Sequence, residues 1–220
     1  MKLKFANPSL LLASVLISAA PLATARAEAG SVSLTVSVFN DVGASQSVLS
    51  EAQVRATYIM RQAGVSLAWL DCGSPGSRQP SAGCSAISFP QHLSVRLVSR
   101  ASPAREDAFG QSFQNADGEG SYAIVYFHVL ASSEAAGAVK TGELLGHVVA
   151  HELGHLLLGK DSHSATGLMS AVWRVAELHQ ASRGNLLFTS GQADRIHSRY
   201  LSASARFEKT SEPSQTASGN

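Results

Sequence analysis

The stretch HELGH, at residues 151–155, lies inside an apolar run, and the rest of the chain can be placed around it. On an α-helix, residues four positions apart lie on the same face, about one turn from each other. The imidazoles of His151 and His155 can therefore converge on one metal ion. Glu152 falls on the flank of that face, where its carboxylate can reach a water molecule beside the metal without binding the metal itself.

Two imidazoles with a third protein ligand are typical of a zinc site whose fourth position is left for water. Zinc lowers the pKa of its water, and Glu152 is placed to accept the released proton as a general base. The activated water can then attack a carbonyl, which is the chemistry of peptide-bond hydrolysis. We therefore expect Zn²⁺ as the cofactor and a protein or peptide as the substrate.

The beginning of the chain has the pattern of a secretory signal peptide. A positively charged start is followed by an apolar stretch at residues 10–20, which is too short to span a bilayer comfortably. Ala25 and Ala27 are the small residues expected at a cleavage site. We therefore expect residues 1–27 to be removed, and the mature protein to be secreted or periplasmic without stable membrane association.

The composition indicates one compact domain with a sizeable core. The chain has 220 residues, of which 45% are hydrophobic and 15% charged, and its formal net charge is +1. This charge offers no broad basic surface, so we expect no nucleic-acid partner. The sequence leaves the oligomeric state open.

Cys72 and Cys84 are the two cysteines of the chain. They are separated by a loop rich in Gly, Pro and Ser. In an oxidising compartment such a pair is expected to form one disulfide that fixes the loop.

Apolar periodicity predicts an α/β domain with a mixed, mostly parallel twisted sheet. The first strand alternates strictly between apolar and polar residues, as a half-buried strand does. The last is a nearly continuous apolar run, which is typical of an interior strand. The succession of a strand, a helix and a second strand near the start of the domain predicts a parallel crossover. The expected strands are residues 31–38, 65–70, 93–97, a short edge strand at 108–113, and 122–130.

The first helix is expected at residues 50–63. Ser50 and Gln53 form a plausible capping box at its start, and Gly64 ends it. Val54 and Tyr58 follow at helical spacing.

The HELGH stretch belongs to a second helix, expected at residues 143–158. Its leucines would pack on the sheet, which turns the histidine face toward a cleft. Two more helices, at about 171–180 and 189–201, would form a small helical C-terminal lobe. Residues 205–220 lack periodicity and are expected to form a polar flexible tail.

The segment from His151 to Met169 resembles the metzincin clan of zinc peptidases. The clan has the pattern His-Glu-x-x-His-x-x-Gly-x-x-His, followed by a methionine turn beneath the metal. The order is the same here, with Gly159, His163 and Met169 after the pentapeptide. The spacing differs, because the glycine comes one position late and the third histidine two positions late. The His-Ser pair at His163 and the turn at Met169 are similar to those of matrix metalloproteinases.

The altered spacing leaves the third metal ligand open. His163 is favoured because of its sequence context. Asp161 stands where the clan has its third ligand, and some members use aspartate there. A glutamate on the following helix, such as Glu177, would make the site gluzincin-like.

The resemblance implies a zincin-like fold backed by the active-site helix. Residues 28–204 would then form a single catalytic domain, with an upper lobe at about 28–159 and a lower lobe at about 160–204. Met169 would pack beneath the ligands without coordinating the metal. The edge strand at 108–113 would pair with an extended peptide.

These observations predict a secreted zinc-dependent endopeptidase. An amidase acting on cell-wall peptides is the alternative within hydrolases. A non-catalytic, zinc-stabilised binding protein is the alternative outside them. Glu152 argues against a binding protein, since a structural zinc site does not need a carboxylate beside its ligands.

Overall fold

The computed structural model describes the folded part of the chain between the two ends. The expected signal peptide, residues 1–27, lies outside the described part, and so do residues 212–220 of the expected tail. The described residues are 32–73, 83–100, 108–135, 137 and 139–211.

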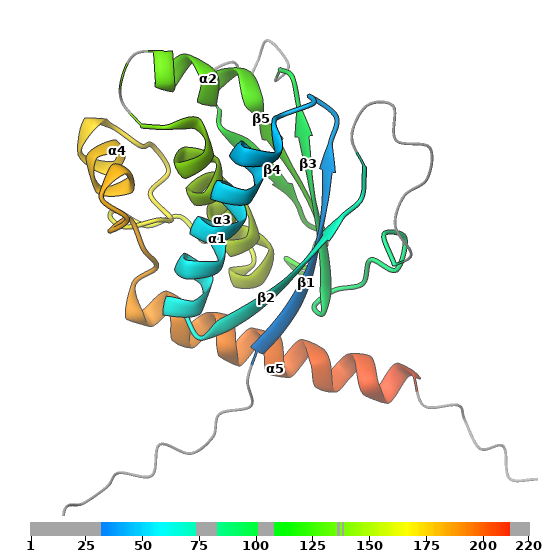
Figure 1. Cartoon of the computed structure of the whole chain (residues 1–220). Helices are drawn as coiled ribbons and strands as arrows, with labels where there is room; N and C mark the ends of the chain where they lie inside the picture. The colour runs from blue at the N-terminus through cyan, green and yellow to red at the C-terminus, as the bar shows by residue number, and fades with distance from the viewer. Residues whose placement is uncertain (1–31, 74–82, 101–107, 136, 138, 212–220) are drawn as a thin grey trace, which may run out of the picture.

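The described strands form one five-stranded sheet (Figure 1). They are β1 (Val32–Asn40), β2 (Val65–Asp71), β3 (His92–Val98), β4 (Gly110–Phe113) and β5 (Tyr122–Tyr126). Their order across the sheet is β2-β1-β3-β5-β4. All neighbouring pairs are parallel except β4 and β5, which are antiparallel. The mixed, mostly parallel sheet and its short antiparallel edge strand are thus confirmed.

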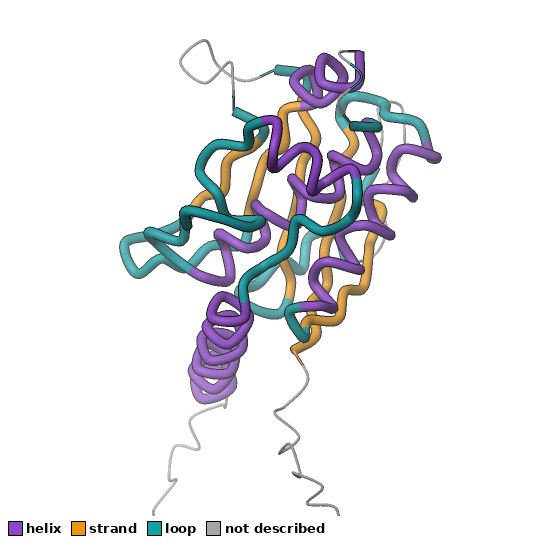
Figure 2. Tube along the Cα trace, turned by 90° about the vertical axis from the view of Figure 1, so that its left-hand side faces the viewer, coloured by secondary structure: helices purple, strands orange, loops and turns teal. Residues whose placement is uncertain are grey.

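Two of the helices cover one face of this sheet (Figures 1 and 2). The described helices are α1 (Gln46–Gln62), α2 (Phe127–Ala135), α3 (Thr141–Leu158), α4 (Val175–Ser182) and α5 (Ser190–Ser211). It is α1 and α3 that pack against each other and against the strands. α5 crosses below the end of the sheet, and Figure 2 shows it nearly end-on.

The core lies between the sheet and the α1–α3 layer. The apolar residues of β1 at positions 32, 34, 36 and 38 are all buried, as the alternation predicts. They belong to the same core as the leucines of α3, of which Leu145, Leu153 and Leu156 are at most 1% exposed. Burying apolar surface at about 25 cal/mol per Å² is what holds the active-site helix against the sheet.

The first helix differs from the prediction in both its start and its buried face. α1 begins four residues earlier than Ser50, with Ser45 as the N-cap that accepts a hydrogen bond from Val48 N. Val54 and Tyr58 are 72% and 39% exposed, so they do not form the packed face. That face includes two alanines, whose small side chains give a weak periodic signal; it consists of Leu49, Ala52, Ala56, Ile59 and Met60.

Three other boundaries differ from the predicted ones by four residues or more. The apolar run expected as one strand to residue 130 leaves the sheet at Tyr126 and continues as α2. α4 begins at Val175, because residues 171–174 form a loop. α5 is opened by the expected Thr189–Gln192 capping box but continues ten residues past Leu201, so residues 205–211 are helical.

The two cysteines are joined as expected. Cys72 and Cys84 form a disulfide with their Cα atoms 5.6 Å apart. Within the described residues, none of the helices combines the length and the apolar character needed to cross a bilayer.

Arg199 of α5 ties three segments together at the end of the active-site helix. Its Nε donates to the carbonyl oxygen of Leu157 at 3.1 Å, and its Nη2 donates to that of Gly118 at 3.2 Å. Gly159 packs against the guanidinium, and a Cβ there would lie 2.7 Å from Arg199 Cζ. Arg199 therefore satisfies a terminal carbonyl of α3 and places a positive charge at the negative end of its dipole.

Arg199→Ala is expected to lower the free energy of unfolding by about 1–3 kcal/mol, because a charged hydrogen-bond donor is lost at a helix end. Chemical denaturation of the two proteins measures the difference. Arg195→Ala is the matched control, since Arg195 is exposed and makes only a 3.5 Å contact with the Lys160 carbonyl. Equal losses in both variants would contradict the role given to Arg199.

Candidate metal centre

The active-site helix α3 is positioned by two glycines that allow close approach. A Cβ at Gly146 would lie 2.7 Å from the carbonyl oxygen of Ala52 in α1. A Cβ at Gly154 would lie 2.7 Å from Met169 Sδ and 2.8 Å from the ring of Phe188. α3 is thus held between α1 and the turn at Met169, and its histidine face is left toward the cleft.

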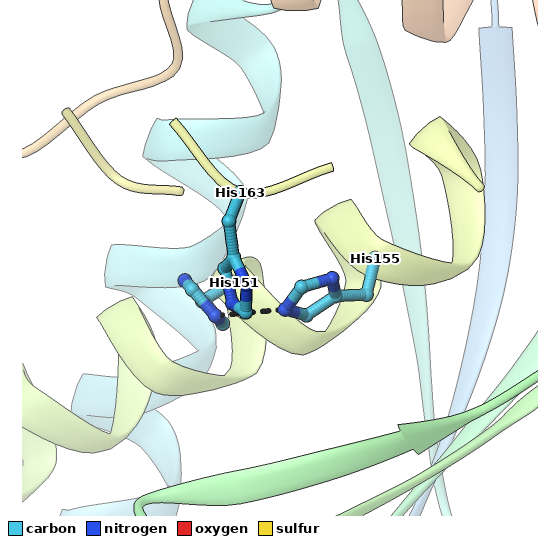
Figure 3. A group of neighbouring side chains, drawn as sticks. All are labelled: His151, His155 and His163. Atoms are coloured by element: carbon cyan, nitrogen blue, oxygen red, sulfur yellow. Dashed lines mark hydrogen bonds between the residues drawn. The ribbon is translucent and has the colours of Figure 1, made fainter. Parts of the chain in front are cut away.

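His151, His155 and His163 converge on one point (Figure 3). The first two project from α3, and His163 reaches them from the segment that follows. One nitrogen from each ring lies within 4.8 Å of the others, and Nε2 of His151 is 3.0 Å from Nε2 of His155. Three imidazoles at this separation are a donor set that suits zinc.

The outer ring nitrogens of the two α3 histidines have partners that the sequence did not reveal. Nδ1 of His151 donates to the carbonyl oxygen of Leu168 at 2.7 Å. Nδ1 of His155 lies 2.7 Å from Ser162 Oγ. Metal-ligating histidines usually donate their other N–H in this way, which fixes the ring orientation and tautomer. Such partners come from loop conformation, and no residue pattern marks them.

The two alternative third ligands lie apart from this group. Among the described residues, the only group of histidine, cysteine and carboxylate side chains suited to one ion is the three histidines. Asp161 is exposed and occupies a left-handed turn with φ of 53°. Glu177 accepts a 2.8 Å hydrogen bond from the backbone N–H of Arg174 and so caps α4.

The segment that carries His163, residues 159–169, is called the ligand loop below. Ser164 N donates to the Met169 carbonyl at 2.9 Å, and Ser164 Oγ accepts a 3.0 Å hydrogen bond from Gln192 Nε2. Met169 itself is fully buried and packs against Gly154. Together with the hydrogen bond of Ser162 to His155, these contacts fix the ligand loop on both sides of His163.

Glu152 is buried at the same cleft. Its side chain is 4% exposed, and Oε2 has no hydrogen-bond partner among the described residues. Burial raises the pKa of Glu152 to about 8. A carboxylate in this position needs a nearby cation to stay ionised at neutral pH, and the three histidines offer the place for one.

Gly110 of β4 leaves the room that the Glu152 carboxylate occupies. A Cβ at this position would lie 2.6 Å from Glu152 Oε1 and 2.7 Å from the carbonyl oxygen of Ile124. The edge strand can therefore pass directly over the carboxylate only because residue 110 is glycine.

Burial also keeps His151 and His155 neutral. It lowers the pKa of His151 to about 4 and that of His155 to about 3, and the charges of neighbouring histidines act in the same direction. Neutral imidazole is the form that binds a metal. The two α3 histidines are therefore ready to act as ligands at neutral pH.

His147 does not belong to the metal centre. It is fully buried one turn before His151, and its Nδ1 is 2.9 Å from the Glu143 carbonyl oxygen. It does not line the cleft. Burial lowers its pKa to about 4.

A cleft of about 580 Å³ opens beside the histidines. β4 forms one wall, and the loop after Met169 forms the other. Trp173 lies on this second wall, where its Nε1 donates to the Leu168 carbonyl at 3.2 Å, and its ring is 5.5 Å from that of His151 and 5.6 Å from that of Phe109. Trp173 therefore both lines the cleft and packs against a candidate ligand.

The buried groups predict that the metal-free protein is most stable near pH 6.5. Between about pH 4 and the ordinary histidine pKa of 6.5, only the unfolded chain binds the protons of His147, His151 and His155, so the free energy of unfolding rises with pH. Between the ordinary pKa of 4.5 and about 8, only the folded chain holds the proton of Glu152, so this contribution falls with pH. Below pH 6.5, the rise in the free energy of unfolding from the three histidines is larger than the fall from Glu152. Above pH 6.5, only the fall from Glu152 remains.

Thermal unfolding of the metal-free protein across this range measures the effect, which is at most about 1.4 kcal/mol per pH unit for each proton. Glu152→Gln should lose the decline above pH 6.5, because an amide does not titrate. His179→Ala should keep the wild-type profile, since His179 is exposed. A wild-type stability that stays level from pH 6.5 to 8 would show that the folded chain does not hold the Glu152 proton.

Solved structures that match this chain include an archaemetzincin and a metalloproteinase. Archaemetzincin from Methanopyrus kandleri matches with a TM-score of 0.50 and 19% identity, over 77% of this chain and 96% of that chain. Metalloproteinase-II from Bacteroides fragilis matches with a TM-score of 0.46 and 13% identity, over 77% of this chain and 54% of that chain. Neither the family models nor the curated proteins yield a match. The likeness to archaemetzincin confirms the zincin-like α/β fold expected from the sequence.

Proposed function

We propose that this protein is a secreted or periplasmic zinc-dependent endopeptidase with a metzincin-like site. One observation carries the proposal: the three converging histidines lie in an open cleft beside a buried carboxylate whose Oε2 has no hydrogen-bond partner within the described residues. A structural zinc site would be closed and would not leave Glu152 without a partner. The archaemetzincin-like fold agrees with this reading.

His151, His155 and His163 would hold the zinc ion, with Leu168 and Ser162 orienting the two α3 rings. When bound, zinc supplies Lewis-acid activation of water and of the scissile carbonyl. Glu152 accepts the proton of the attacking water at its free Oε2 and passes it to the leaving amine. Its burial in the cleft shields this proton transfer from bulk solvent.

The substrate is proposed to be an extended peptide. β4 is the last strand of the sheet, and within the described residues no strand pairs with its outer edge. Gly110, Gln111 and Ser112 of this strand line the cleft. An extended chain can add to such an edge by main-chain hydrogen bonds, which places its peptide bonds beside the histidines.

A mixed peptide library tests the proposal. The protein is expressed with residues 1–27 and purified after export, and its N-terminus is sequenced. Peptides should be cleaved internally, cleavage should stop with a zinc chelator, and added zinc should restore it. Cell-wall peptides included in the library test the amidase alternative. Cleavage that the chelator does not affect would contradict the zinc mechanism. Zinc binding without any cleavage would favour the non-catalytic binding protein.

A further inference from the structure

Ser162 stands in the part of the ligand loop that is longer than in the metzincin pattern. It comes immediately before His163, yet its side chain turns inward and the residue is only 6% exposed. Its Oγ lies 2.7 Å from Nδ1 of His155. The added residues of the ligand loop thus bring a hydroxyl to the outer nitrogen of one candidate ligand and an imidazole to the metal position.

With Nδ1 of His155 at Ser162, Nε2 is the nitrogen that faces the metal position. When Nδ1–H donates to the hydroxyl oxygen, the Nε2 lone pair is free and points toward His151 Nε2, 3.0 Å away. Leu168 does the same for His151 through a carbonyl oxygen, which can only accept. The outer nitrogens of the two α3 histidines are therefore held by two different oxygen atoms of the same ligand loop.

The backbone of the ligand loop keeps Ser162 in place. Gly159 and Asp161 have positive φ angles of 80° and 53°, which reverse the chain after α3. Beyond His163, the Ser164 N–H donates to the Met169 carbonyl at 2.9 Å. The backbone of Ser162 is thus held between two fixed points. Its short side chain then suffices to place the hydroxyl at His155.

We propose that Ser162 is a positioning residue of the metal centre, whose hydroxyl fixes the ring of His155 with Nε2 toward the metal. This inference rests on the proposed function, since it takes the three histidines as zinc ligands. Partners of this kind change metal affinity by about 10–100-fold when they are removed. A residue that served packing alone would change stability and leave the affinity for zinc unaltered.

The chain contains a matched control for this distinction. Ser37 Oγ lies 2.7 Å from Nε2 of His92, and both residues are buried in the sheet. Ser37→Ala therefore removes the same kind of buried serine–histidine hydrogen bond at a place where no candidate ligand is involved. Any effect on zinc that comes from general loosening of the fold should appear in both variants.

The test is the zinc dissociation constant of the mature protein, measured by competition with a chelator. Ser162→Ala should weaken zinc binding by about 10–100-fold and alter the absorption spectrum of the cobalt-substituted protein. Ser162→Thr, which keeps the hydroxyl, should restore most of the affinity. Ser37→Ala should lower the melting temperature while zinc binding stays at the wild-type level.

Two results would overturn the assignment of Ser162. One is a Ser162→Ala variant that binds zinc as tightly as the wild type. The other is an equal loss of zinc affinity in Ser162→Ala and Ser37→Ala. Both leave the proposed function standing, because the wild-type chain still binds zinc. A wild-type chain that fails to bind zinc would instead overturn the proposed function, and the role of Ser162 with it.

Discussion

Replacing Glu152 with glutamine is expected to lower peptide hydrolysis by about 10²–10⁴-fold, the range for loss of a general base. The expected loss follows from the position of the carboxylate. Its Oε2 is buried at the cleft and has no hydrogen-bond partner among the described residues, so it is free to accept the proton. The amide of glutamine has nearly the same size and fits the space beside Gly110, so the fold should be retained.

The ratio kcat/KM of a cleaved peptide, measured with equal zinc content in both proteins, gives the effect. Glu208→Gln is the matched control, because Glu208 is an exposed glutamate on α5. Zinc should remain bound in Glu152→Gln, since the carboxylate is not one of the three converging side chains. Full activity in this variant would require another base, and loss of zinc would mean that Glu152 is itself a ligand.

Because Glu152 can be protonated or ionised, the Glu152→Gln variant also has an expected effect on the stability of the metal-free protein. Burial raises the pKa of Glu152 to about 8 in the metal-free protein, so the group is held in its protonated form at neutral pH. A cation at the histidines would favour the ionised form that a base requires. The same substitution should therefore stabilise the metal-free protein above pH 6.5 and inactivate the loaded one, and structural damage would not produce both effects.

The sequence predicted the sheet and the active-site helix well because both have strong periodic signals. The alternation in β1 and the four-residue spacing of His151 and His155 depend only on local geometry. The buried face of α1 was missed because alanines at positions 52 and 56 contribute little to an apolar pattern, while the more apolar Val54 points to solvent. The apolar pattern of a sequence does not predict the buried face of a helix where tertiary packing selects small side chains.

The surroundings of the metal centre could be predicted only in part. The residues that orient the two α3 histidines belong to the ligand loop, where positive φ angles at Gly159 and Asp161 set the chain direction. Ser162 has no signature that distinguishes it from the exposed serines of the chain. The contact between Trp173 and His151 also depends on how the loop after Met169 folds back.

His163→Ala is expected to weaken zinc binding by more than about a hundredfold, beyond the range for an orienting partner. This variant leaves two imidazoles, and a stable zinc site needs a third protein ligand. The prediction is geometric, since the ring of His163 lies 4.6 Å from that of His155 and 5.7 Å from that of His151. Zinc content after dialysis, together with residual hydrolysis, measures the effect.

Asp161→Ala and Glu177→Ala separate His163 from the other two ligands that the spacing allows. Asp161 is exposed outside the histidine group, and Glu177 caps α4, so both variants should keep their zinc. Glu177→Ala should lose only about 0.5–2 kcal/mol of stability, as expected for a helix cap. If His163→Ala retained zinc and Asp161→Ala lost it, the ligand loop would have to refold on metal binding and follow the shorter metzincin spacing. The two-residue extension would then be an insertion within the turn, and Ser162 would no longer face His155.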